Sequence, residues 1–140
     1  MGWLDAIGSA AKHLADSIPE AEAETGLCEY LIRLENVPGS MSACCEAIAE
    51  HGVNIVSGAG LGSEHAVAAL VTDDSDATRA ALDGIGANYA VDKLQTIELA
   101  NEPGSLAAFT RSLADEGVNL RSVYVLSTGE DSVVMGYTTG

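Results

Sequence analysis

The chain has 140 residues, 47% of them apolar, which is enough to bury a sizeable core in one compact body. Twenty-one acidic residues against six basic ones give a net charge of −15, which excludes nucleic acids and anionic membranes as partners. Three cysteines, two of them adjacent, make no disulfide framework and predict a reducing cytoplasm. No stretch approaches the ~20 apolar residues of a membrane span, and no signal peptide is evident.

Residues 1–26 predict an amphipathic helix followed by an acidic linker. Apolar side chains recur at three- and four-residue steps along the first 18 residues, on one helical face: Trp3, Leu4, Ile7, Ala11, Leu14 and Ile18. Pro19 ends this helix, and the segment up to Gly26 has nothing to bury. The polar face lacks the basic residues of a membrane-surface helix, so the stripe favours a protein partner or the chain's own sheet.

Residues 27–95 predict a first βαββαβ module, with one antiparallel sheet and both helices on one face. Asp73 to Asp76 offer several N-caps for its second helix. The expected elements are strands at 28–35, 53–57, 66–72 and 89–95, helices at 38–51 and from the cap to 85, and a flexible glycine-rich turn at 58–62.

Residues 96–140 predict a second, incomplete module that begins without a linker. Its helix should carry Leu106, Phe109 and Leu113 inward and end at Gly117. Strands are expected at 96–100, 118–126 and 133–137, with a turn at 127–130. The closing helix and strand of the first module have no counterpart here. We therefore expect the N-terminal helix to pack near Phe109 and Leu113, in the place of the missing helix.

The two modules carry the same turn sequence. Asn36-Val37-Pro38-Gly39-Ser40-Met41 returns sixty-five residues later as Asn101-Glu102-Pro103-Gly104-Ser105-Leu106, and eleven of 24 aligned positions from Leu34 and Leu99 onward are identical. In each copy an apolar run ends in Asn-x-Pro-Gly, a helix follows, and Gly-Val-Asn opens the next strand. This agreement predicts an internal repeat.

The repeated turn has the chemistry of a small binding site. Proline near the first helical position loses no hydrogen bond, and glycine lets another molecule approach the backbone. The unpaired N–H groups of a helix start attract a carboxylate, and the asparagine adds one donor and one acceptor. Such a site suits a free amino acid. The alternative is that Asn36 and Asn101 merely brace their own turns.

The pattern of strand, Asn-x-Pro-Gly, helix and Gly-Val-Asn resembles the ACT domain, a βαββαβ amino-acid-sensing module attached to enzymes of amino-acid metabolism. The resemblance covers residues 27–140 in two copies. In that family the first turn and the start of the second strand line an effector site at a domain–domain interface. If the effector site of that family is transferred to this sequence, the resemblance implies ligand contacts at Asn36, Val37, Pro38, Gly39, Ser40, Met41, Asn54, Ile55, Asn101, Pro103, Gly104, Ser105, Leu106, Asn119 and Leu120.

Catalytic chemistry is not predicted. The three histidines have no cysteine or carboxylate at metal-ligand spacing, and Ser40 and Ser105 lack the Gly-x-Ser-x-Gly elbow of a nucleophile. We expect no catalytic residue, no metal and no cofactor. The sequence therefore favours an α+β, non-enzymatic regulatory protein that binds an amino acid between tandem modules, as a homodimer or with a partner enzyme. The alternative is a ligand-free assembly module that pairs with an enzyme.

Overall fold

The computed structural model describes residues 26–140, which divide into two compact units, residues 26–93 and 94–140. The helix expected over residues 1–18, its linker and its packing on the second module lie outside the described residues. In the part of the chain that is described, no helix is long and apolar enough to cross a membrane.

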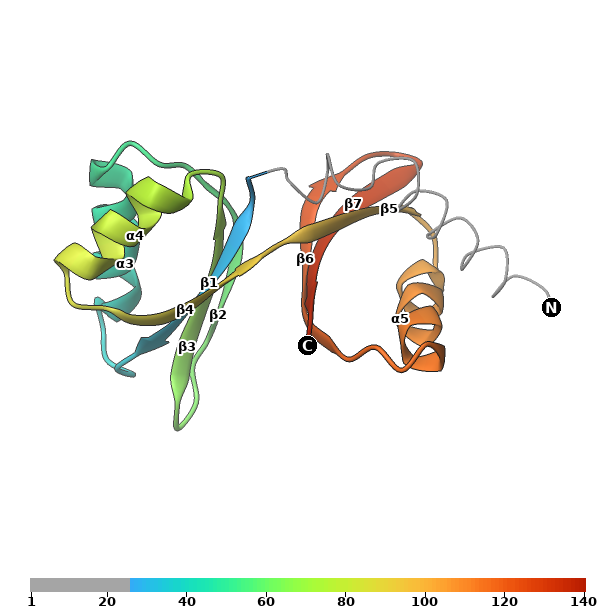
Figure 1. The fold of residues 1–140 in the computed structure, drawn as a ribbon, viewed down its shortest axis with the longest axis horizontal. Helices are drawn as coiled ribbons and strands as arrows, with labels where there is room; N and C mark the ends of the chain where they lie inside the picture. The colour runs from blue at the N-terminus through green and yellow to red at the C-terminus, as the bar shows by residue number, and fades with distance from the viewer. Residues whose placement is uncertain (1–25) are drawn as a thin grey trace. The chain divides into compact units, whose positions relative to one another are not determined.

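The first unit is a four-stranded antiparallel sheet with two helices on one face (Figure 1). The strand order is β2-β3-β1-β4, and each neighbouring pair is antiparallel. Its elements, in chain order, are β1 (Cys28–Leu34), α3 (Ser40–Glu50), β2 (Ile55–Leu61), β3 (Ala66–Thr72), α4 (Ser75–Gly84) and β4 (Asn88–Lys93).

The core of the first unit lies between the sheet and both helices. Alternate residues of β1 point to this side, so Tyr30 and Ile32 are fully buried. Helix α4 begins at an Asp74 cap, whose side chain accepts a 3.0 Å hydrogen bond from the Ala77 amide. The cap confirms one of the expected candidates. The buried cluster consists of Tyr30, Ile32, Cys44, Ala47, Ile48, Val53, Ala68, Leu70, Ala81 and Leu82.

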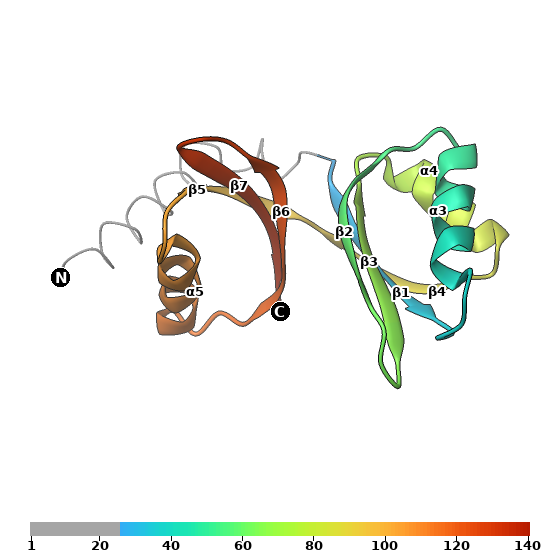
Figure 2. The ribbon, with the colours of Figure 1, turned by 180° about the vertical axis from the view of Figure 1, so that it is seen from behind.

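The second unit has three antiparallel strands in the order β5-β7-β6 and one helix on one face (Figure 2). Its core contains Ile97, Leu99, Phe109 and Met135, and the ring of Phe109 meets that of Tyr137 edge-on at 5.0 Å. Within residues 26–140, β5 pairs only with β7 and forms an edge of the sheet. The elements are β5 (Gln95–Ala100), α5 (Ser105–Asp115), β6 (Leu120–Thr128) and β7 (Ser132–Thr139).

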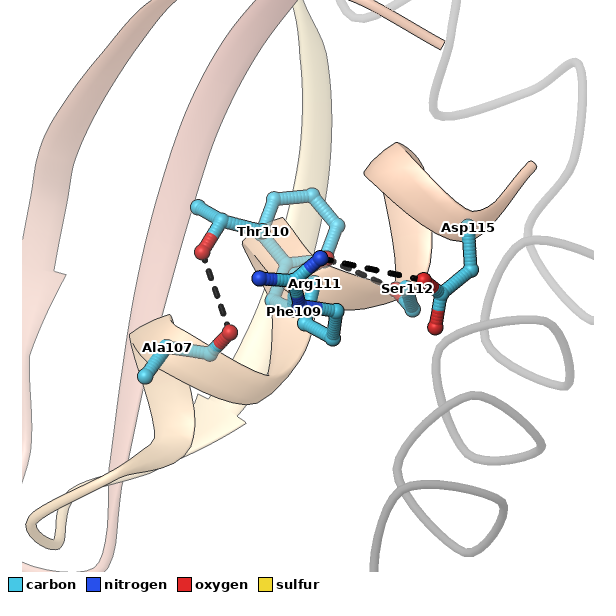
Figure 3. Close-up of polar contacts among 6 residues, drawn as sticks. All are labelled: Ala107, Phe109, Thr110, Arg111, Ser112 and Asp115. Atoms are coloured by element: carbon cyan, nitrogen blue, oxygen red, sulfur yellow. Dashed lines mark hydrogen bonds and ion pairs between the residues drawn. The ribbon is translucent and has the colours of Figure 1, made fainter. Parts of the chain in front are cut away.

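Polar contacts on α5 are local (Figure 3). The Thr110 hydroxyl donates to the Ala107 carbonyl at 3.0 Å, and the Ser112 hydroxyl donates to the Phe109 carbonyl at 2.7 Å. Arg111 and Asp115 form a 3.9 Å ion pair whose side chains are 64% and 53% exposed, so it contributes little stability. Helix α5 is attached to its sheet by burial of the helix face that carries Phe109.

Several sequence-based boundaries were wrong, among them two in the first unit. Helix α3 begins at Ser40 rather than at Pro38. Strand two runs over Ile55–Leu61 rather than 53–57, so the glycine-rich segment from Gly58 belongs to a strand and not to a flexible turn. Gly58 pairs with Leu70, and a Cβ at Gly58 would lie 2.7 Å from the Ala69 carbonyl oxygen. The glycine therefore permits close approach of two strands.

In the second unit the corresponding strand, β6, runs over Leu120–Thr128, two residues later than the predicted 118–126. The turn expected at 127–130 is therefore shifted toward β7. The glycine helix stops were predicted correctly, since Gly52 and Gly117 follow α3 and α5 with φ of 74° and 75°.

Candidate functional site: the Asn-x-Pro-Gly turn and the following hairpin

The two repeated turns have the same backbone conformation. Gly39 caps α3 with φ 92° and ψ −12°, and Gly104 caps α5 with φ 93° and ψ −13°. Residues with a side chain rarely adopt such positive φ values, so each turn requires its glycine. Neither helix has a side-chain cap, and each proline lies one residue before the cap rather than at the first helical position. Backbone groups alone thus shape the start of each helix.

Each repeated asparagine bonds the next hairpin. The Asn36 amide nitrogen Nδ2 donates to the Ser63 carbonyl at 3.0 Å, and the Asn101 Nδ2 donates to the Gly129 carbonyl at 2.8 Å. A carbonyl oxygen can only accept, so this bond fixes which end of the amide faces the hairpin. Bracing was one of the two expected roles, but the segment braced is the turn of the following hairpin. The side-chain oxygen Oδ1 is the end of each asparagine that can accept from a ligand.

A pocket of about 170 Å³ lies at the first turn. It is formed by the end of β1, the turn, the start of α3 and the β2–β3 hairpin, all within the first unit. Most of its wall is apolar. The lining residues are Leu34, Glu35, Asn36, Val37, Ser40, Met41, Gly60, Leu61, Gly62, Ala66 and Val67.

Four residues of the predicted site line this pocket: Asn36, Val37, Ser40 and Met41. Pro38, Gly39, Asn54 and Ile55 do not. Ile55 pairs with the last residue of β3, whereas the pocket lies at the opposite end of β2, six residues further along. At ~3.3 Å per residue this separation is ~20 Å. Within one unit the turn and the start of strand two therefore do not meet, and closure of the site by the other copy stays a prediction.

The second turn lies in a similar local setting. Pro103 and Gly104 are exposed, Ser105 is buried, and the Leu106 side chain is 43% exposed. Leu120 opens β6, with Asn119 just before it. It pairs with Thr139, at the end of the sheet away from the β6–β7 hairpin that Asn101 bonds. The two predicted halves of the second site are also apart within their unit.

Sequence reasoning missed the hairpin side of the pocket. Gly60, Leu61 and Gly62 were interpreted as a flexible turn, and Ala66 and Val67 only as a strand. A signal was present, because alternating small residues within a strand often mark a place where another group approaches closely. Glu35, immediately before the asparagine, was also missed.

The described residues contain no group of three or more His, Cys, Asp or Glu side chains that could hold a metal ion. Cys44 is buried in the core of the first unit. Burial raises the pKa of its thiol above the ordinary value, and the neighbouring Cys45 adds to this shift. A thiol with a raised pKa is a poor nucleophile at neutral pH.

Several solved structures resemble the chain. A protein of Bacteroides thetaiotaomicron matches with a TM-score of 0.68 at 20% identity, over 80% of this chain and 78% of its own. The ligand-free regulatory subunit of aspartate kinase from Thermus thermophilus matches with a TM-score of 0.61 at 15% identity, over 79% and 81%. A structure of aspartokinase alpha and beta subunits matches with a TM-score of 0.59 at 21% identity, over 81% and 83%.

Neither a protein-family model nor the sequence of a curated protein matches the chain. The structural likeness shows the fold, which is α+β with antiparallel sheets and of the ACT-like, ferredoxin-like type. Aspartate kinase regulatory subunits share this fold, so the expectation of an α+β, ACT-like fold with antiparallel sheets was correct.

Proposed function

We propose that the protein is a non-enzymatic regulatory protein of amino-acid metabolism that binds a small amino acid at its Asn-x-Pro-Gly turns. The observation that supports this most is the position of the 170 Å³ pocket. It lies where the turn meets the hairpin, on a fold that also occurs in regulatory subunits of aspartate kinase. A concave, mostly apolar site with a few polar groups is typical of small-ligand binding.

In the proposed mechanism the turn binds both charged groups of an amino acid. The ligand carboxylate meets the backbone N–H groups of Gly39 and Ser40, where the start of α3 favours negative charge. The Ser40 N–H bonds the Val37 carbonyl at 3.4 Å, a long bond that a charged acceptor can replace. Asn36 holds the hairpin with Nδ2 and offers Oδ1 to the ligand ammonium. Asn101, Gly104 and Ser105 would act alike in the second unit.

The regulatory step would be a change in assembly. In this step a ligand would contact the turn of one module and the strand start of another module, at Asn54 or Asn119. Because it binds one arrangement of the modules more tightly than the alternatives, it favours that arrangement. The partner is a second copy of this chain or an enzyme of amino-acid metabolism.

The test is thermal unfolding of the full chain with each common amino acid. Binding to the folded state alone stabilises by ~2.7 kcal/mol at a hundredfold excess over Kd, so a true ligand must raise the melting temperature. Asn36→Ala with Asn101→Ala should reduce this rise. The control Asn88→Ala, at the exposed first residue of β4, should leave it unchanged. If no amino acid raises the melting temperature, the proposal is wrong.

One observation favours a second candidate, an assembly module without a ligand. Both asparagine amides are bonded to hairpin carbonyls, so each turn is braced before any ligand arrives. Such a protein would associate with a partner enzyme at an affinity that amino acids do not change. Isothermal calorimetry of the chain with a candidate partner, with and without the amino-acid mixture, separates the two functions.

A further inference from the structure

The pocket of the first unit has an apolar wall with one charge. Glu35 is its single charged lining residue, and Asn36 and Ser40 are its polar side chains. The apolar part of the wall comes from Leu34, Val37, Met41, Leu61, Ala66 and Val67. Val37 is 54% exposed and Leu61 is 71% exposed, so two large apolar side chains at the pocket remain in contact with water. An apolar group in the pocket would cover them.

The pocket has the size of a branched aliphatic side chain. Its volume is about 170 Å³. An apolar protein cavity of about 150 Å³ accommodates benzene, so this one accommodates the isobutyl group of leucine or the isopropyl group of valine.

Charge sets which end of an amino acid lies near the pocket. The carboxylate of Glu35 attracts an ammonium group and repels a second carboxylate. The lining contains no lysine or arginine to pair with an acidic side chain. An acidic ligand such as aspartate would therefore enter with an unpaired charge, which is unfavourable.

Gly60 leaves the pocket open, and the second unit differs at this position. A Cβ at Gly60 would meet no heavy atom within 4 Å. Gly60 pairs with Ala68 of β3, and at the corresponding place in β6 Val125 pairs with Met135 of β7. The second unit thus carries a branched side chain where the first unit carries only hydrogen.

We propose that the pocket of the first unit selects amino acids with a branched aliphatic side chain, with the side chain against Leu34, Met41 and Val67 and the ammonium group near Glu35. In the second unit Val125 stands at the position of Gly60, so we expect a narrower site there and tighter binding in the first unit. The inference rests on the proposed function and names the ligand class of the same site.

The test compares four probes on the full chain by calorimetry: L-leucine, 3-methylbutylamine, 4-methylpentanoate and L-aspartate. We expect leucine to bind best of the four, with one tight site per chain, in the first unit. The amine, which lacks the carboxylate, should bind better than 4-methylpentanoate, which lacks the ammonium. Aspartate should bind at least tenfold more weakly than leucine.

Two variants locate the site. Gly60→Val places a branched side chain at the pocket wall, where a Cβ would meet no heavy atom within 4 Å. It should weaken leucine binding roughly tenfold or more without lowering the melting temperature in the absence of ligand. Glu35→Gln should weaken leucine binding about threefold and remove the preference for the amine. The matched controls are Ile85→Val, an exposed apolar residue outside the pocket, and Glu50→Gln, at the far end of α3.

The outcomes separate this inference from the proposed function. Tighter binding of aspartate, or leucine binding that survives Gly60→Val, overturns the ligand class while amino-acid binding stands. Two equal sites per chain overturn the assignment to the first unit. If neither leucine nor aspartate binds, the ligand class is wrong, and the proposed function is wrong as well if no common amino acid raises the melting temperature.

Discussion

The two units share a turn but differ in how their cores are filled. Gly39 and Gly104 agree within one degree in φ and in ψ. Four residues into each helix, however, the first unit carries the small Cys44 where the second carries Phe109. Among residues 26–140, the buried cluster of the first unit has ten residues and that of the second has four. The turn geometry therefore depends on its local backbone and its asparagine bond, and it tolerates a change in the packing beneath.

Replacing the aromatic residue should give the largest difference between the units. Phe109→Ala removes the largest buried side chain of a small cluster and should lower the free energy of unfolding by ~3–5 kcal/mol. Cys44→Ala, at the equivalent position, removes one buried atom and should lower it by about 1 kcal/mol. Urea unfolding measures both, and hydrogen exchange assigns each loss to its unit. Equal losses would contradict the contrast in packing.

The glycine-rich strand should give the next effect. In Gly58→Ala the new methyl group would lie 2.7 Å from the Ala69 carbonyl oxygen and 2.8 Å from the Leu70 side chain, so we expect a loss of ~1–3 kcal/mol. Val123→Ala is the matched change in β6, where the side chain is 37% exposed, and it should cost less than ~1 kcal/mol. A neutral Gly58→Ala in urea unfolding would show that β2 and β3 do not need this close approach.

The asparagine bonds should behave alike in both units. Asn36→Ala and Asn101→Ala each remove one exposed hydrogen bond to a hairpin carbonyl, with an expected loss of about 1 kcal/mol. The two losses should add, because the bonds lie in separate units. Thermal or urea unfolding of the single and double variants measures this. A loss confined to one variant would show that only one asparagine braces its hairpin.

Alkaline pH should produce the smallest difference between the units, since each unit contains a tyrosine whose pKa is shifted in the same direction. Burial raises the pKa of Tyr30 and that of Tyr137 above the ordinary tyrosine value of about 10. A raised pKa in the folded state gives stability that is complete below pH ~10 and is lost as pH rises through the folded value. Tyr30→Phe and Tyr137→Phe should each flatten this decline in unfolding free energy. If the free energy of unfolding of both variants declines with pH as in the original protein, the two tyrosines do not cause the decline.

Local signals predicted much of the fold. Strand three was predicted at 66–72, as observed, because an unbroken apolar run lies between the polar pairs Glu64-His65 and Asp73-Asp74. The Asp74 cap and the glycine stops were also recognised, since each depends on backbone chemistry within a few residues. The internal offset of sixty-five residues then transferred the first strand, the Asn-x-Pro-Gly turn, the helix and its glycine stop to the second unit.

The pocket could not be predicted in the same way, because its two walls are far apart in sequence. Glycines at 58, 60 and 62 indicate a loop by propensity, and only the pairing with β3 makes Gly58 and Gly60 strand residues. Interpreting them as a loop removed the hairpin from the predicted site. Asn54 was included by family resemblance, and its distance from the turn depends on the length of β2, which local propensity does not give.

The bond from Asn36 to Ser63 joins residues 27 positions apart, and the bond from Asn101 to Gly129 joins residues 28 apart. During synthesis the first turn emerges well before its partner carbonyl, so the β1–α3 segment exists for a time with an unbraced turn. Contacts of long sequence separation form late because loop closure must come first. Each turn thus gains its final geometry only when the hairpin after it has folded, and the order of folding, rather than the order of the sequence, decides when the proposed site is complete.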